Sequence, residues 1–215
     1  MLVNGQHYTS TLDDDGDFVL SEHCQRLIDE CDIIITNPPF SKFRSFLTKI
    51  LENQKKFLII GNQNAFAYKE VFPYLKSGEI RTGYNMVKKF IQFDGSIKQF
   101  GNICWFTNLP TTKSEKPLEL KKEYDPALYP KYDNYNAINI DRAVDIPKDY
   151  NGIMGVPITF LDKICLSQFK IIGVSASWDE TPEMKEIKTS PKKRHGPFIN
   201  GKEKYKRLFI KPLTK

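Results

Sequence analysis

The stretch DIIITNPPF at residues 32–40 constrains the fold more than any other part of the chain. Ile33, Ile34 and Ile35 follow one another with no polar residue between them. An apolar run of this kind is typical of a strand that is covered on both faces in the middle of a doubly wound α/β sheet. Two prolines follow within four residues of Ile35, and neither can donate a backbone hydrogen bond to a sheet. The sequence therefore predicts a buried strand that ends abruptly in an Asn-Pro-Pro-Phe turn.

Helical and extended patterns alternate around this strand. They predict three helices, at residues 22–31, 42–51 and 68–75. They also predict three strands, at residues 32–36, 56–61 and 101–109. Ser21 and Ser41 can cap the first two helices, and Gly78 can end the third, inside which Pro73 is a poor helix residue. An antiparallel direction is one option for the last strand. This alternation favours an α/β sheet with parallel neighbours.

The C-terminal half has a weaker pattern. Residues 111–123 are polar and predict a loop, and residues 124–155 show little periodicity. The segments ITFL (158–161), FKIIGVSA (169–176) and YKRLFIKP (205–212) predict strands. We therefore expect an irregular, β-rich C-terminal part.

The composition is ordinary for a globular protein, with 40% hydrophobic and 27% charged residues among 215. No apolar run approaches the roughly 20 residues of a membrane helix, and no signal peptide is visible at the N-terminus. The four cysteines and three histidines are scattered without the spacing of a zinc site. These features predict a cytoplasmic protein with reduced thiols, no metal and no membrane association.

Positive charge is concentrated near the C-terminus. Residues 185–215 contain 11 Lys and Arg against two Glu, although the whole chain has a net charge of only +6. Such a basic segment suits a polyanion such as DNA or RNA. The alternative is a solvated lysine-rich surface.

The chemistry of the Asn-Pro-Pro-Phe turn points to a planar amine. Ligands of a doubly wound sheet bind at the carboxyl ends of its strands. There Asn37 offers a side-chain carbonyl, Pro39 holds the Pro38 carbonyl in an extended direction, and Phe40 offers a flat stacking face. Two acceptors aimed at one exocyclic amine would localise its lone pair for attack on an electrophilic methyl group. The alternative is a turn in which proline merely ends the strand.

DIIITNPPF and the following SKFRSFL resemble the catalytic motif of adenine-specific DNA methyltransferases, most closely the EcoRI-type modification methylases. The resemblance extends over about residues 16–175, through KFLIIGNQNAFAYKEVFPYLKSG, GNICWFTNL, YPKYDNYNAINI and GIMGVPITFLDK, and YKRLFIKP also fits. It implies a Rossmann-like fold and methyl transfer from S-adenosylmethionine to N6 of an adenine flipped out of double-stranded DNA, in a restriction–modification system. It implies catalytic roles for Asn37, Pro38, Pro39 and Phe40.

The resemblance and the strand ends suggest further site residues. DGDF (15–18) resembles the acidic segment beside the adenine of the methyl donor, so Asp17 and Phe18, together with Asn37, are predicted cofactor contacts. The predicted nucleic-acid contacts are Asn62, Asn64, Trp105, Lys192, Lys193 and Arg194. For the two asparagines a polar turn is the alternative. Trp105 and Phe106 can close a base pocket or pack in the core, and core packing is favoured.

The family's donor site needs an earlier strand, a glycine loop and a further acidic residue, and no such unit precedes residue 32. We therefore expect a chain truncated at its N-terminus relative to the family, lacking the first strands of the sheet and leaving the edge of the 32–36 strand open. Residues 1–110 would form a partial catalytic domain and residues 111–215 a target-recognition part. A missing N-terminal segment or a partner chain would complete the enzyme.

Two other function classes remain open at this point. An Asn-Pro-Pro-Phe turn also suits N-methylation of RNA or of a glutamine amide in protein. A non-catalytic DNA-binding remnant would keep the basic segment and lose donor binding.

Overall fold

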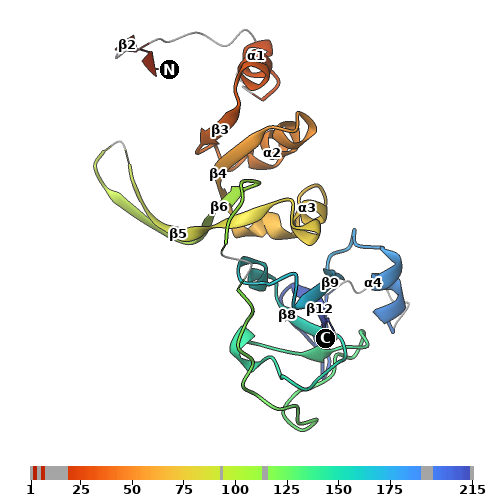
Figure 1. Ribbon diagram of the computed structural model, residues 1–215. Helices are drawn as coiled ribbons and strands as arrows, with labels where there is room; N and C mark the ends of the chain where they lie inside the picture. Colours follow the sequence, from red (N-terminus) through yellow and green to blue (C-terminus); the bar gives the residue numbers. More distant parts are fainter. Residues whose placement is uncertain are drawn as a thin grey trace.

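The computed structural model describes Leu2–Val3, Gln6–His7 and residues 19–92, 94–112, 116–189 and 196–213. These residues form a mixed α/β structure with two four-stranded sheets (Figure 1). The first sheet is built from residues 33–107 and the second from residues 138–212. Two short hairpins lie apart from them, formed by β1 (Leu2–Val3) with β2 (Gln6–His7) and by β10 (Phe198–Ile199) with β11 (Lys202–Glu203).

The first sheet has the strand order β3-β4-β6-β5. β3 (Ile33–Thr36) runs parallel to β4 (Lys56–Asn62), and β6 (Ile97–Thr107) runs antiparallel to both β4 and β5 (Arg81–Ile91). The predicted strands at 32–36, 56–61 and 101–109 are confirmed, the last in the antiparallel direction. β5 was not predicted, because its sequence RTGYNMVKKFI has no regular alternation of apolar and polar residues.

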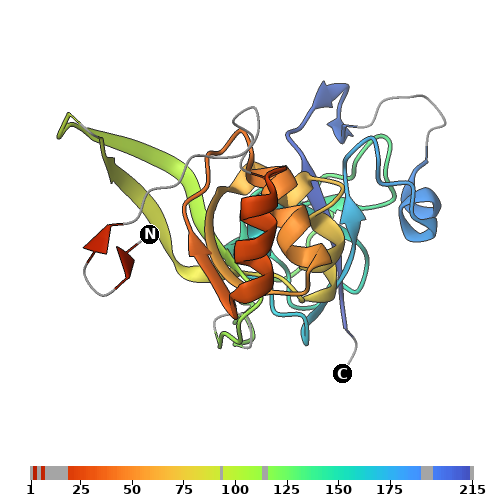
Figure 2. The ribbon, with the colours of Figure 1, turned by 90° about the horizontal axis from the view of Figure 1, so that it is seen from above.

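Helices α1 (Glu22–Glu30), α2 (Phe43–Glu52) and α3 (Phe72–Ser77) lie along one side of this sheet, and the β5–β6 hairpin projects on the other side (Figures 1 and 2). The predicted cap of the first helix is confirmed, since the Cys24 N–H donates to Ser21 Oγ at 3.1 Å.

The start of the other two helices differs from the prediction. Lys42, not Ser41, precedes α2 and makes no side-chain cap, because the Pro39 carbonyl accepts from the Lys42 N–H in a backbone turn, at 2.9 Å. The third helix begins only at Phe72 because Pro73 is tolerated solely in a first turn. It ends as predicted at Gly78, whose φ of 80° favours glycine.

The apolar face of α2 packs against the sheet, and its buried residues are Phe43, Phe46, Leu47 and Ile50. The Phe43 ring lies over Gly61 of β4, where any Cβ atom would overlap the ring. This close approach fixes the first turn of α2 against the carboxyl end of β4, and with it the loop that enters α2.

The second sheet has the order β7-β8-β12-β9. β12 (Arg207–Pro212) lies between β8 (Met154–Pro157) and β9 (Phe169–Val174) and is antiparallel to both, while β7 (Ile138–Asn139) pairs with β8. The predicted strands in FKIIGVSA and YKRLFIKP are confirmed. The predicted strand ITFL is wrong: after Pro157 the chain forms a 3₁₀ helix, η3 (Ile158–Asp162), which turns Ile158, Phe160 and Leu161 inward.

The two sheets share one hydrophobic core. The Trp178 ring lies 5.7 Å from the Phe72 ring of α3, and its Nε1–H donates to the Ala67 carbonyl at 3.0 Å. Ala67 ends η1 (Gln63–Ala67), the 3₁₀ helix after β4. Lys76 of α3 also donates to the Ile172 carbonyl of β9 at 2.7 Å. Two short helices, η2 (Ala143–Asp145) and α4 (Pro182–Ile187), complete the C-terminal part.

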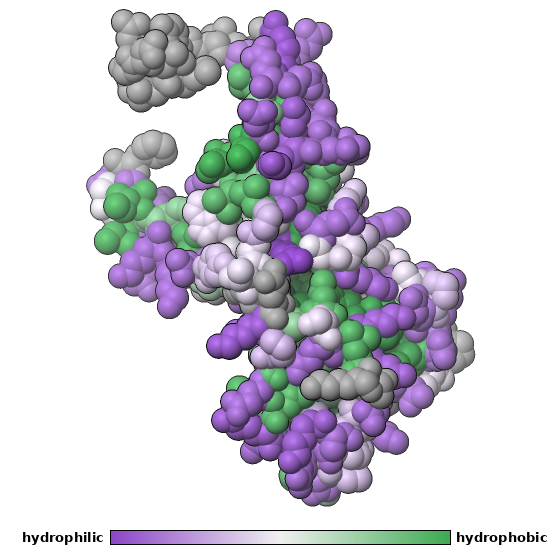
Figure 3. Space-filling model, viewed as in Figure 1, coloured by the Kyte–Doolittle hydropathy of each residue, from purple (hydrophilic) through white to green (hydrophobic). Residues whose placement is uncertain are grey.

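β3 differs from its prediction in how far its side chains are buried, and not in its position at an open edge of the described sheet. Among the described strands it pairs only with β4, so it forms an edge of the sheet. Ile33 is 44% exposed and Ile35 is 67% exposed, so the strand is not covered on both faces. Figure 3 shows apolar side chains at the surface beside β3. Within the described residues no helix has the length and apolar content needed to cross a membrane.

Candidate active site

The Asn-Pro-Pro-Phe turn lies where the sequence placed it, directly after β3. Because β3 and β4 are parallel, this turn and the Asn62 end of β4 lie at the same edge of the sheet. Asn37 is exposed and Pro38 is buried. The turn opens into a hollow of about 620 Å³, which is lined by Asn37, Pro38, Pro39, Phe40, Phe90, Ile91, Gln92 and Phe100. Its volume is within the roughly 300–1,000 Å³ of small-molecule pockets.

Two hydrogen-bond acceptors of this turn are free within the described chain. The Pro39 carbonyl accepts from Lys42, and the Phe40 carbonyl accepts from the Phe43 N–H at 3.3 Å, so both start α2. Among the described residues, neither the Asn37 side chain nor the Pro38 carbonyl has such a partner. Two adjacent acceptors are thus available to a donor that enters the hollow.

Three phenylalanine rings form one wall of the hollow. Phe40 lies edge-on to Phe90 and to Phe100, each with ring centroids 6.4 Å apart, and Phe90 and Phe100 are 5.2 Å apart. Such edge-to-face pairs are favourable beyond the area they bury. Sequence reasoning missed Phe90 and Phe100, which come from the two strands of the β5–β6 hairpin. The only sign of them in the sequence is that aromatic residues flank the turn DGS (94–96) on both sides.

The other predicted contacts lie outside this hollow where they are described. Asn62 Oδ1 accepts from the Asn64 N–H at 2.8 Å and from Asn102 Nδ2 at 3.2 Å, so Asn62 stabilises the turn that starts η1. Asn64 is exposed. Trp105 is half-buried on β6, and it does not line the hollow around Asn37. Phe106 is fully buried against Phe43. It therefore packs in the core, which the sequence analysis favoured over a place in a base pocket.

Five predicted site residues lie outside the described residues: Asp17, Phe18, Lys192, Lys193 and Arg194. In the part of the chain that is described, no cluster of three His, Cys, Asp or Glu side chains could hold a metal ion.

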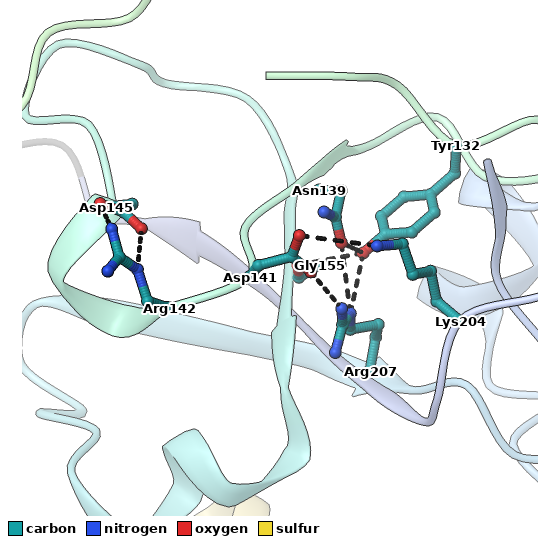
Figure 4. A network of polar contacts seen from close by, with 8 residues as sticks. All are labelled: Tyr132, Asn139, Asp141, Arg142, Asp145, Gly155, Lys204 and Arg207. Atoms are coloured by element: carbon teal, nitrogen blue, oxygen red, sulfur yellow. Dashed lines mark hydrogen bonds and ion pairs between the residues drawn. The ribbon is translucent and has the colours of Figure 1, made fainter. Parts of the chain in front are cut away.

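The second sheet has a polar cluster of a different kind, centred on Arg207 (Figure 4). Arg207 is buried, with 7% of its surface exposed. Its guanidinium donates to Asp141 Oδ1 at 2.6 Å and to Asn139 Oδ1 at 3.3 Å. The Tyr132 hydroxyl donates to the same Asn139 oxygen at 2.7 Å and lies 3.1 Å from the Gly155 carbonyl. Each of these buried groups has a partner in the cluster.

The cluster changes the acidity of two of its members. Burial raises the pKa of the Tyr132 hydroxyl well above its usual value, although the charge of Arg207 opposes this shift. Burial also disfavours the charged form of Asp141, but a hydrogen bond from Asn139 and the charges of Lys204 and Arg207 outweigh it. The pKa of Asp141 is therefore lowered, and the carboxylate stays ionised beside Arg207.

A family model described as adenine-specific methyltransferase EcoRI matches residues 4–212. The chain belongs to this family. The resemblance that the sequence suggested is therefore confirmed, while the roles of residues 37–40 stay predictions.

Three relatives are similar over most of this chain. Type II methyltransferase M.EcoRI of Escherichia coli is 40% identical over 217 residues, which cover 92% of this chain and 62% of the relative. M.MgeORF184P of Mycoplasma genitalium is 31% identical, with coverages of 97% and 73%, and M.MpnI of Mycoplasma pneumoniae is 32% identical, with coverages of 86% and 65%. The chain thus spans 62% of the length of the Escherichia coli relative. No solved structure matches it.

Proposed function

We propose that this chain forms the target-base side of a restriction–modification DNA methyltransferase that methylates N6 of adenine. The observation that carries the proposal is the pair of free acceptors, the Asn37 side chain and the Pro38 carbonyl, beside the exposed ring of Phe40 in one hollow. The relatives named as Type II methyltransferases support this type of chemistry. An adenine inside a duplex cannot reach such a hollow, so it has to be flipped out of the stack.

In the proposed mechanism, the flipped adenine stacks on Phe40 and directs its N6 amino group at Asn37 and Pro38. The two N–H groups donate to the Asn37 side-chain carbonyl and to the Pro38 carbonyl. These hydrogen bonds pull the nitrogen toward tetrahedral geometry, and its lone pair leaves the ring system. Fixed dipoles of this kind stabilise the transition state without reorganisation during the reaction. The bond from N6 to the methyl carbon would form as the methyl–sulfur bond of the donor breaks, with the sulfur leaving as a neutral thioether, and the nitrogen would then release a proton to water.

S-adenosylmethionine is the proposed cofactor, and it would supply an electrophilic methyl group. The open acceptors and the volume of the hollow fit a planar amine on the target side. For the donor itself we propose Asp17, Phe18 and Asn37 as contacts. For the DNA we propose Asn62, Asn64, Trp105, Lys192, Lys193 and Arg194, with residues 111–215 as a target-recognition part and residues 1–110 as the catalytic part.

We further propose that the first sheet is Rossmann-like and that the free edge of β3 accepts another strand. Ile33 and Ile35 of β3 are exposed, and Leu27 of the adjacent α1 is 43% exposed. An exposed apolar edge strand attracts further strands and is normally covered. A parallel strand beside β3, from whichever polypeptide provides it, would cover these side chains and extend the same edge that carries Asn37.

The experiment that tests the proposed function is a methyl-transfer assay with tritiated S-adenosylmethionine. The substrates are duplex DNA, a transcribed RNA of the same sequence and glutamine-containing peptides, and nucleosides are separated after digestion. We expect label in N6-methyladenine from DNA alone. Label in RNA or in glutamine would replace the proposed substrate, and binding of DNA without any label would favour a non-catalytic DNA-binding protein.

A further inference from the structure

We propose that the end of the β5–β6 hairpin is an apolar wedge that enters the duplex beside the adenine and helps to hold it out of the base stack. The proposal rests on the proposed function and assigns a role in it to two residues, Ile91 and Ile97. They are a cross-strand pair, the last pair before the turn of the hairpin.

The first observation is exposure. Ile91 is 80% exposed and Ile97 is 60% exposed, and every described residue between them is also exposed. The end of the hairpin projects beyond the rest of the first sheet in Figures 1 and 2, and Figure 3 shows apolar side chains at this end. Single exposed isoleucines are common on protein surfaces. Two exposed isoleucines side by side at the end of a projecting hairpin indicate a surface that binds another molecule.

The second observation is that the end of the hairpin has a defined shape. The Gln92 N–H donates to the Ser96 carbonyl at 2.8 Å, and the Gly95 N–H donates to the Gln92 carbonyl at 3.0 Å. The Asp94 carboxylate accepts from the Ser96 N–H at 2.9 Å. A hydrogen-bonded turn therefore holds the two isoleucines side by side, so little conformational entropy is lost when they insert.

The third observation is continuity with the active site. Ile91 and Gln92 border the hollow that contains Asn37. Successive side chains of a strand point to opposite faces, and Phe90 packs on Phe40. Phe90 therefore forms part of the wall of the base hollow, and Ile91 borders the same hollow at the end of the hairpin, where it is paired with Ile97. A base entering this hollow leaves its gap in the stack close to the two isoleucines.

Charge indicates DNA as the partner in preference to a second copy of the chain. Lys88, Lys89 and Lys98 are exposed on the two strands beside the apolar pair, whereas the acidic residue Asp94 belongs to the turn. Lysines on the strands would meet the phosphates on either side of an inserted wedge. Two copies of this hairpin would bring like charges together. Apolar side chains inserted between base steps are an established way to unstack and kink a duplex.

The test uses the double variant Ile91→Thr with Ile97→Thr, because threonine keeps the β-branched shape and removes the apolar end. Val144→Thr, which changes an isoleucine-like side chain that is 72% exposed on η2, is the control. Methyl transfer is measured on a paired duplex and on a duplex with a mismatch opposite the target adenine, where flipping is easier. 2-Aminopurine at the target position reports flipping by its fluorescence.

We expect the double variant to lose about tenfold or more in turnover and in 2-aminopurine signal on the paired duplex, and to recover most of the turnover on the mismatched one. Equal activity of parent and variant on the paired duplex would overturn the proposal, and so would a loss of the same size on both duplexes. A parent that self-associates in sedimentation, with a monomeric double variant, would make the pair a contact between copies instead. Parent and variants are compared in an assembly that binds S-adenosylmethionine, and a parent that methylates neither duplex in that assembly would contradict the proposed function and not the wedge alone.

Discussion

The two sheets of this molecule differ in whether their polar groups have hydrogen-bond partners within the described chain. At the end of β3, Asn37 and Pro38 have acceptors without partners among the described residues, in an open hollow. In the second sheet, Arg207, Asn139 and Tyr132 are buried and are hydrogen-bonded to one another. An unsatisfied acceptor at a surface is available for a ligand, whereas a satisfied buried cluster stabilises a fold. The hydrogen-bond partners of a polar group therefore distinguish groups that are available for chemistry from groups that stabilise the fold.

The largest expected effect is on catalysis, and it tests whether the free acceptor of Asn37 in the first sheet serves the reaction. In whichever assembly is active, Asn37→Ala should lower methyl transfer by about 10²–10³-fold or more, because the lost carbonyl acts on the amine in the transition state. DNA affinity and the unfolding midpoint should stay near those of the parent. Turnover and fluorescence anisotropy with a labelled duplex measure the two quantities, and near-normal turnover would remove the mechanism. Asn85→Ala, at an exposed position on β5 that does not line the hollow, is the control.

A substitution in the second sheet should instead lower the free energy of unfolding. Arg207→Met keeps much of the side-chain length and removes one donor each from Asp141 and Asn139, which keep Lys204 and Tyr132, respectively, as partners. Loss of charged hydrogen bonds in a buried site should cost about 3 kcal/mol of unfolding free energy. Urea unfolding followed by circular dichroism measures it. Arg142→Met, which removes an exposed guanidinium paired with Asp145, should leave the midpoint unchanged. If both variants unfolded alike, the cluster would have no special role in stability.

Phe40 tests whether the first sheet also contributes a stacking face. Phe40→Ala should reduce the stability of the flipped state by about 1–3 kcal/mol, the usual value of one base–aromatic stack. Phe40→Tyr should be tolerated because its ring survives. The fluorescence of 2-aminopurine at the target position reports the flipped state. The idea fails if the alanine and tyrosine variants give the same signal as the parent.

A smaller effect concerns acid stability in the second sheet. The pKa of Asp141 is lowered in the folded protein, so its contribution to stability is fully present above the ordinary aspartate pKa of about 3.9. The contribution is lost as the pH falls through the lower folded pKa, where the carboxyl takes up a proton. The parent should therefore be more stable than Asp141→Asn at neutral pH, and the difference should shrink below about pH 4. Unfolding curves measured between neutral and acidic pH would reveal it, and a constant difference would contradict it.

The smallest effect concerns the basic segment near the C-terminus. Neutralising Lys192, Lys193 and Arg194 together should flatten the salt dependence of DNA affinity by up to about one unit of slope for each lost phosphate contact. Turnover at saturating DNA should not change. Titrations at several salt concentrations give the slope. An unchanged slope would assign this basic segment to the solvated surface.

Local sequence patterns predicted the first sheet well and the second poorly. Ile33 to Phe40 is a local signal, since three consecutive isoleucines indicate a strand and two prolines fix where it ends. The family motif adds a role to the same residues. The antiparallel β6, the cap at Ser21 and the end of α3 at Gly78 were predictable for the same local reason.

The errors arose where distant residues decide the outcome. Ser41 lost its role as a cap because carbonyl groups of Pro39 and Phe40 start α2 instead. Phe90 and Phe100 reach the hollow only through the register of the β5–β6 hairpin, which the irregular sequence of β5 conceals. The Arg207 cluster joins residues about 70 positions apart, and a charged residue in a strand ordinarily predicts a solvent-facing position.

The position of β12 has a consequence for how the protein is made. β12 is the last described strand of the chain to be synthesised, and it lies between β8 and β9, which do not pair with each other in the described sheet. A nascent chain can fold its first sheet as soon as β6 has emerged, whereas the second sheet has to wait for residues 207–212. Any product that stops before Arg207 would leave β8 and β9 with bare edges. Such a product should be a substrate for chaperones and proteases, so synthesis itself would screen out incomplete molecules.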